Sequence, residues 1–179
     1  MQLDAFPPIL DACCGGRMFH FDKSNPRVLY ADIRAESHVL CDGRGFEVSP
    51  DVIADFREMP FPDGAFSVVV FDPPHIERAG PKSYQATKYG KLSAAWRDDL
   101  RAGFAECFRV LRPHGVLVFK WNEVQIPLSQ ILPLALPQTP VVGHKTGRQA
   151  KTHWCLFVKE DTAPELAVWV IQRMEADRA

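Results

Sequence analysis

The sequence predicts an α/β fold built on a doubly wound, mostly parallel sheet with an antiparallel final strand. Short apolar runs alternate with segments that carry helix signals, the order of elements that is typical of such sheets. Several of these runs stop at an Asp or a Gly-Gly turn. The run over residues 65–71 is apolar apart from Ser67, which is typical of a strand buried on both faces of a parallel sheet.

The first half of the chain is expected to supply four strands. The first covers residues 9–14, after Pro7-Pro8 and before the Gly15-Gly16 turn. The next three are expected at residues 28–31, 52–54 and 65–71, and they end at Asp32, Asp55 and Asp72. Residues 38–48 contain a Cys-Asp-Gly-Arg-Gly turn between short apolar stretches, so we expect them to form an inserted surface hairpin.

The second half is expected to continue with helices and strands. Apolar residues recur at steps of four, four, four and three from Trp96 to Leu111, the spacing of one helical face, and Pro113 ends that helix. Residues 116–121 are expected to form the fifth strand, and residues 124–136 a shorter helix. The final strand pair is expected at residues 141–142 and 154–158.

Length and composition indicate one globular domain. At 179 residues, with 46% hydrophobic and 24% charged residues, the chain can bury one core but not a second. We expect the domain to cover residues 1–161. Residues 162–179 are expected to form an appended helix, because Thr162 and Glu165 have capping-box spacing and an apolar stripe follows. Without a run of roughly 20 apolar residues or a signal peptide, we expect a cytoplasmic protein that does not contact membranes.

Cysteine spacing and net charge limit the function classes. The five cysteines include no Cys-x-x-Cys pair, which predicts reduced thiols and no metal site. A net charge of −1 gives no overall attraction to nucleic acid, so binding of a polyanion would depend on local basic patches.

The strand ends indicate a nucleoside ligand without phosphates. Ligands of open α/β sheets bind at the carboxyl ends of the strands, where Asp11, Asp32, Asp55 and Asp72 are expected. Each Asp alone could equally be a turn or capping residue. After Gly16 the next glycine is Gly43, so the sequence lacks both the Gly-x-Gly-x-x-Gly fingerprint and a phosphate-binding loop. Asp32 follows Asp11 by 21 residues, the separation of a carboxylate that binds ribose hydroxyls.

With these features the chain resembles the class I methyltransferases, which use S-adenosylmethionine as methyl donor. Residues 11–16 (Asp-Ala-Cys-Cys-Gly-Gly) are similar to their first motif, residues 29–32 to their ribose-binding strand end, and residues 54–61 to their adenine-contacting segment. Residues 109–119 resemble the turn into their fifth strand. The resemblance implies a Rossmann-like sheet and a donor site formed by Asp11, Ala12, Cys13, Gly15, Gly16, Asp32, Ile33, Asp55 and Phe56.

Residues 72–75 (Asp-Pro-Pro-His) resemble the Asp-Pro-Pro-aromatic motif of amino-methyltransferases, and the chain is most similar to small enzymes of phages and prophages. The resemblance implies methyl transfer to an exocyclic amino group of adenine or cytosine in DNA or RNA, with Asp72, Pro73, Pro74 and His75 as catalytic residues. Asp72 and the Pro73 carbonyl would accept the N–H groups of the amine, which localises its lone pair. His75 departs from the motif, where an aromatic ring stacks on the flipped base.

Two basic segments are candidates for contact with nucleic acid. Residues 78–91 and 144–153 would lie at the rim of the site, and we expect substrate contacts from His75, Lys88, Lys145, Arg148 and Lys151. Two alternatives remain at this stage. One is an enzyme of the same fold that methylates a small molecule or a protein side chain. The other is a binding module without catalysis, whose carboxyl-terminal helix docks a partner or a second copy.

Overall fold

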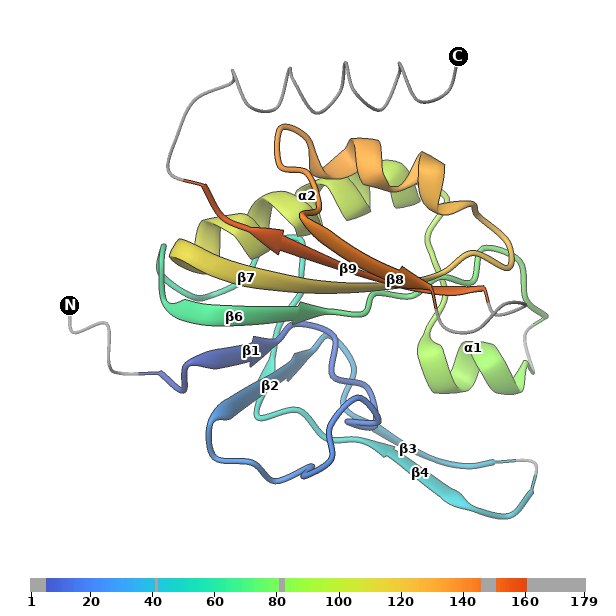
Figure 1. The fold of residues 1–179 in the computed structure, drawn as a ribbon. Coiled ribbons are helices and arrows are strands. Elements are labelled where there is room, and N and C mark those ends of the chain that lie inside the picture. Colours follow the sequence, from blue (N-terminus) through green and yellow to red (C-terminus); the bar gives the residue numbers. More distant parts are fainter. Residues whose placement is uncertain (1–5, 41, 81–82, 146–150, 161–179) are drawn as a thin grey trace.

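A seven-stranded sheet forms the centre of the protein (Figure 1). The computed structural model describes residues 6–40, 42–80, 83–145 and 151–160. The strand order is β5-β2-β1-β6-β7-β9-β8. The strands are β1 (Ile9–Asp11), β2 (Val28–Asp32), β5 (Val52–Ile53), β6 (Phe66–Phe71), β7 (Leu111–Asn122), β8 (Val142–Lys145) and β9 (Thr152–Val158).

The strand directions confirm the predicted fold class. Strands β5, β2, β1, β6 and β7 are mutually parallel, whereas β9 pairs antiparallel with β7 on one side and with β8 on the other. The sheet is therefore mostly parallel, with the last strand running in the opposite direction. This parallel arrangement brings the carboxyl ends of β2, β1 and β6 to one edge of the sheet.

One face of the sheet carries the main core. Helix α2 (Trp96–Val110) has the predicted periodicity and buries Leu100, Phe104 and Cys107 against β6 and β7. Its first turn contains Asp98 and Asp99, which favour a helix amino terminus through the helix dipole. The short helix η3 (Leu132–Ala135) packs beside α2 on the same face (Figure 1).

The prediction of a single helix at residues 124–136 is wrong. Two short 3₁₀ helices, η2 (Leu128–Gln130) and η3, occupy this segment. Pro127 and Pro133 explain the difference, because proline has no N–H to donate and its ring clashes with a preceding helical turn. The first strand is also shorter than expected, since it ends at Asp11 instead of Cys14.

The connections between β1, β2 and β5 contain turns and a hairpin instead of helices. Among the described residues, no helix lies between Asp11 and Val52, so this half of the sheet is not wound as a doubly wound fold would be. The predicted hairpin is present as β3 (Glu36–Val39) and β4 (Gly45–Val48), which pair antiparallel. A separate small cluster of Cys14, Val28 and Tyr30 packs under the loop after β1.

The searches for membrane spans and metal clusters cover the described residues. Within these residues no helix is long and apolar enough to cross a membrane, and no group of His, Cys, Asp and Glu side chains could hold a metal ion. The appended helix that we expect at 162–179 lies outside the described part of the chain.

Gly103 of α2 provides a test of this packing. A Cβ added there would lie 2.7 Å from Phe56 and 2.8 Å from Phe71. Because overpacking a core costs ~1–3 kcal/mol and the helix propensity of alanine returns ~1 kcal/mol, we expect Gly103→Ala to lower the free energy of unfolding by about 1 kcal/mol. Urea denaturation measures this change.

Gly45→Ala is the matched control, because an added Cβ there meets no atom within 4 Å. Its free energy of unfolding should stay within ~0.5 kcal/mol of the wild type. A more stable Gly103→Ala variant would contradict the close contact between α2 and the two rings.

Candidate functional site

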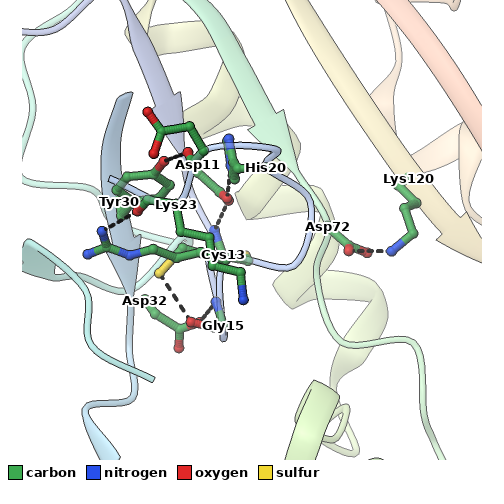
Figure 2. A network of polar contacts seen from close by, with 12 residues as sticks. Asp11, Cys13, Gly15, His20, Lys23, Tyr30, Asp32, Asp72 and Lys120 are labelled. Carbon is green, nitrogen blue, oxygen red and sulfur yellow. Dashed lines mark hydrogen bonds and ion pairs between the residues drawn. The ribbon is translucent and has the colours of Figure 1, made fainter. Parts of the chain in front are cut away.

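Three carboxylates lie at the carboxyl ends of neighbouring strands, and each has its own partner (Figure 2). Asp11 ends β1 and contacts the Nε2 atom of His20 at 2.8 Å. Asp32 ends β2 and accepts from the backbone N–H of Gly15 at 2.9 Å. Asp72 follows β6 and accepts from the ammonium of Lys120 on β7 at 2.5 Å. The predicted cluster of strand-end carboxylates is therefore formed by three side chains.

Asp11 is the most enclosed of these carboxylates. Its exposed fraction is only 1%, and it also accepts from the backbone N–H of Cys13 at 3.2 Å. Burial raises the pKa of Asp11, and the hydrogen bond and charge of His20 oppose that rise. The His20 ring packs edge-on against Tyr30 with its centroid at 4.9 Å. The loop after β1 is thus folded back on the sheet through His20.

Asp32 connects the first loop to the second strand. Gly15, which donates to it, has a φ of +47°, a conformation that glycine adopts without strain. The other carboxylate oxygen accepts from the backbone N–H of Arg34 at 2.9 Å. The Arg34 guanidinium extends further and donates to the carbonyl of Thr87 in helix α1 (Tyr84–Tyr89) at 3.1 Å. Arg34 therefore links the end of β2 to α1 across the cleft.

Lys120 leaves one side of Asp72 available. It contacts the Oδ2 atom, and its ammonium also lies 5.8 Å from the ring of Phe19. Within the described residues, Oδ1 of Asp72 has no hydrogen-bond partner. Both side chains of the pair are about a quarter exposed, so the pair faces the cleft.

Two adjoining cavities lie along this edge. The larger one, about 300 Å³, is lined by the end of β1, the Gly15-Gly16 turn and the strand ends of β6 and β7. The smaller one, about 130 Å³, lies on the β2 side. Both are lined by Cys13, Arg34, Asp72 and Tyr89, so Asp72 borders each of them.

Most of the predicted donor-site residues line these cavities. The larger cavity contacts Asp11, Cys13, Gly15 and Gly16, and the smaller one contacts Ala12, Cys13, Asp32, Ile33 and Phe56. Asp55 lines neither cavity. Its carboxylate is held by Arg57 at 2.6 Å, and Arg57 also contacts Asp99 of α2, so Asp55 fastens the loop to that helix.

His75 lies between aromatic rings at the edge of the larger cavity. Its ring centroid is 5.8 Å from that of Tyr89 and 6.3 Å from that of Trp121. Burial lowers the pKa of His75, the nearby Lys120 charge lowers it further, and Asp72 opposes the shift. The lowered pKa favours the neutral imidazole at pH 7, and the ring is tilted by 43° relative to that of Tyr89. Pro73 lines the larger cavity and Pro74 the smaller one.

The predicted substrate residues are only partly brought to the cleft. Lys88 lines the larger cavity, and its ammonium lies 5.3 Å from the ring of Tyr89. Lys151 is exposed and lines neither cavity. Lys145 ends β8, but its side chain and the whole of Arg148 lie outside what the structure describes.

The sequence analysis missed His20, Arg34 and Lys120 as site residues. Lys120 carried a usable signal: it is a charged residue near the carboxyl end of an otherwise apolar strand, two positions after Val118. Such a side chain faces the same side as Val118 and reaches the strand end. His20 and Arg34 lie in loops, where residue spacing gives no comparable signal.

Burial disfavours the thiolate form of Cys13 and Cys14 in the first motif. Burial is the main cause that raises the pKa of Cys13 well above its usual value and that of Cys14 to about 12. Nucleophilic attack needs a thiolate. These cysteines therefore act through packing and backbone contacts.

Solved structures with the same arrangement decide the fold family. One is protein PH0226 from Pyrococcus horikoshii OT3, at 17% identity, 85% coverage of this chain, 81% of that chain and a TM-score of 0.56. A TehB-like SAM-dependent methyltransferase from Corynebacterium glutamicum matches at 15% identity over 85% and 79% of the two chains, with a TM-score of 0.53. The chain has the fold of the class I methyltransferases.

A third similar structure contains a ligand in its own site. It is the 1,6-didemethyltoxoflavin-N1-methyltransferase of Burkholderia thailandensis with S-adenosylhomocysteine bound, at 16% identity over 87% and 72% of the chains and a TM-score of 0.50. No protein-family model and no curated protein sequence matches this chain. At these identities the comparisons establish the shared fold, and function has to be argued from the site.

The buried pair of Asp11 and His20 generates a prediction about stability and pH. His20→Phe keeps a ring against Tyr30 but leaves the Asp11 carboxylate buried without its partner. Because leaving a buried polar group without a hydrogen-bond partner costs ~1–3 kcal/mol, we expect a loss of that order at pH 7.5. Urea denaturation of the variant and the wild type measures it.

The pH dependence of the stability loss in His20→Phe shows whether the Asp11 charge causes it. Without His20 the folded-state pKa of Asp11 rises further above its unfolded value of 3.8. A raised folded pKa destabilises the ionised form at neutral pH, and this penalty is relieved as pH falls through the raised pKa. The deficit of His20→Phe should therefore be smaller at pH 5.5 than at pH 7.5. An equal deficit at both values would assign the loss to packing.

Proposed function

We propose that the protein transfers a methyl group from S-adenosylmethionine to an exocyclic amino group of a nucleobase in DNA or RNA. The observation that carries this proposal is the position of residues 72–75 (Asp-Pro-Pro-His), which border both cavities of the strand-end cleft. The carboxylate of Asp72 has one unpartnered oxygen among the described residues, and Asp72 lines both cavities.

The chemistry of the cleft fits the donor. A carboxylate offers about four lone-pair sites, and the bonds from Gly15 and Arg34 leave Asp32 one site for a ribose hydroxyl. Ile33 and Phe56 give the smaller cavity apolar walls for an adenine ring. In the larger cavity, Asp11 and Asp72 are suited to bind the positively charged groups of the donor. Arg34 and Lys88 are suited to bind its carboxylate. When bound, S-adenosylmethionine supplies an electrophilic methyl group on a sulfonium sulfur.

Asp72 and Pro73 act on the amine. An exocyclic amine is a weak nucleophile because its lone pair is delocalised into the ring. Acceptance of its N–H groups by Oδ1 of Asp72 and by the Pro73 carbonyl localises the lone pair toward the methyl group. Lys120 holds the other oxygen and so keeps the carboxylate in place, which makes it a positioning residue. Asp72 is also placed to take the proton that the amine loses.

His75 supplies a surface for the base. Its pKa is lowered, so the ring is neutral at pH 7 and can stack, and the neighbouring Tyr89 extends this surface. The stacking aromatic of the Asp-Pro-Pro-aromatic motif is thus replaced here by an imidazole backed by a tyrosine. Lys88 and the segment at residues 144–153 are proposed to contact the nucleic-acid backbone, which requires cations but little sequence recognition.

Removal of the Asp72 charge tests the proposal. Wild-type protein and Asp72→Asn are incubated with labelled S-adenosylmethionine and separate pools of duplex DNA, single-stranded DNA, transfer RNA and ribosomal RNA, and modified nucleosides are identified by mass spectrometry. We expect one aminobase to be methylated, and turnover to fall by about 10²-fold or more in the variant with the donor Kd unchanged.

Asp98→Asn is the matched control, because Asp98 is exposed on α2 and pairs with Arg101, away from the cleft. It should retain wild-type turnover. If the wild type binds the donor but modifies no nucleobase, the acceptor is a small molecule or a protein side chain. If it does not bind the donor at millimolar concentration, the methyl transfer proposal fails.

The basic segment generates a separate prediction. Replacing Lys145, Arg148 and Lys151 together by Gln should weaken nucleic-acid binding and reduce the slope of log K against log salt concentration by up to ~3, because each lost phosphate contact removes ~0.9 for duplex DNA. Donor affinity should not change. Fluorescence anisotropy of a labelled oligonucleotide at several salt concentrations measures the slope, and an unchanged slope would mean that the segment does not touch phosphates.

A further inference from the structure

A third cavity lies next to the catalytic motif, on the side away from Asp32. It measures about 340 Å³ and shares His75, Tyr89 and Lys120 with the larger cavity of the cleft. The rest of its wall comes from the end of β7, the loop that follows and the start of β9, with Asn122, Val124, Gln125 and Thr152. A flat group whose amine reaches Asp72 can therefore extend past His75 into this space.

The charge of the cavity limits the kind of acceptor that it can take. None of the described residues that line it is an Asp or a Glu, and the charged side chain in its wall is the cation Lys120. The nearby carboxylate, Asp72, is paired with that lysine through its Oδ2 atom. An aliphatic amine has a pKa near ~10 and carries a positive charge at pH 7. Such an acceptor would bring its positive charge close to Lys120, in a cavity whose described lining contains no carboxylate to balance it.

Asn122 and Thr152 form a fixed polar pair in the wall. They are directly opposite each other at the end of the β7–β9 ladder, and Nδ2 of Asn122 donates to Oγ1 of Thr152 at 3.2 Å. Oδ1 of Asn122 accepts from the backbone N–H of Val124 at 3.1 Å, which fixes the orientation of the amide. The Thr152 hydroxyl proton has no partner in the part of the chain that the structure describes. It is therefore available to donate into the cavity.

Gln125 has a different role in the same wall. Its Oε1 accepts from the backbone N–H groups of Glu77 and Arg78 at 2.9 and 2.7 Å, and its Nε2 donates to the carbonyl of Arg78 at 2.9 Å. These bonds use its polar atoms to hold the segment after the catalytic motif. Gln125 shapes the cavity, while recognition is left to Asn122 and Thr152.

We infer that this cavity receives the ring of a neutral heteroaromatic amine and that Thr152, held by Asn122, donates a hydrogen bond to an acceptor atom of that ring. The inference rests on the proposed function and narrows it: ionised aliphatic amines, including lysine side chains, are excluded as acceptors. Adenine and cytosine both meet the requirement, because each carries ring nitrogens or a carbonyl oxygen beside its amino group.

Substitution of Thr152 tests the inference by steady-state kinetics on the oligonucleotide pool that the wild type methylates. Thr152→Val keeps the shape of the side chain and removes the hydroxyl. Because the lost hydrogen bond is equally strong in the bound substrate and in the transition state, KM should rise about 3- to 10-fold and kcat should change less than 2-fold. Thr152→Ser retains the hydroxyl and should restore KM to within about 2-fold of the wild type. The donor Kd, measured by calorimetry, reports that each variant is folded.

Thr139→Val is the matched control: the same exchange at a half-buried threonine that lines none of the three cavities. It should behave as wild type. An unchanged KM in Thr152→Val, or equal defects in the Val and Ser variants, overturns the inference. The proposed function stands in that case as long as the wild type methylates the nucleic acid. Failure of the wild type to methylate any nucleobase is the distinct result that overturns the proposed function.

Acceptor selectivity is measured on the wild type with propylamine and a lysine-containing peptide at pH 7.5, at the donor concentration used above. We expect kcat/KM for both to be at least 100-fold below that of the oligonucleotide. A comparable value for either amine would overturn the exclusion of ionised acceptors.

Discussion

Compensation of negative charge at one sheet edge is the constraint on which the site depends. Parallel pairing places Asp11, Asp32 and Asp72 on neighbouring strands about 4.8 Å apart, and their carboxylates repel one another. The Asp72 charge contributes to the raised pKa of Asp11. His20, Arg34 and Lys120 each offset one carboxylate, and each comes from a different element. The same bonds that relieve repulsion therefore also fix the loops and strands that shape the cleft.

The cleft is closed on its outer side by a helix that is attached through few contacts. Arg34 joins the end of β2 to the Thr87 carbonyl of α1, and Gly90, with a φ of +76°, ends that helix against Pro74 in the segment after β6. A Cβ at Gly90 would lie 3.0 Å from the Pro74 ring. Pro73 and Pro74 hold the backbone after Asp72, and the Pro74 ring also contacts the end of α1.

The sequence was a good guide wherever structure depends on neighbouring residues. Apolar runs and their terminal Asp residues predicted the strands and the carboxylate edge, because both follow from local periodicity and turn chemistry. The pairing of Asp72 with Lys120 was not predictable, since only the strand order brings these residues together. The pairing of Asp11 with His20 was not predictable either, because it depends on the path of the loop after β1. The link from Asp55 through Arg57 to Asp99 of α2 is likewise a contact that spacing in the loop does not reveal.

In the described chain no helix lies between β1 and β5. The half of the sheet with β5, β2 and β1 therefore opens locally more easily than the half with β6 and β7. Beside α2, long strands share a continuous core, whereas β1 and β5 have only three and two residues and are connected by turns. Segments with few buried apolar contacts open most readily. We therefore expect amide hydrogens of the β5–β2–β1 half to exchange faster than those of β6 and β7, and a ligand bound across Gly15 and Asp32 to slow exchange mainly in that half.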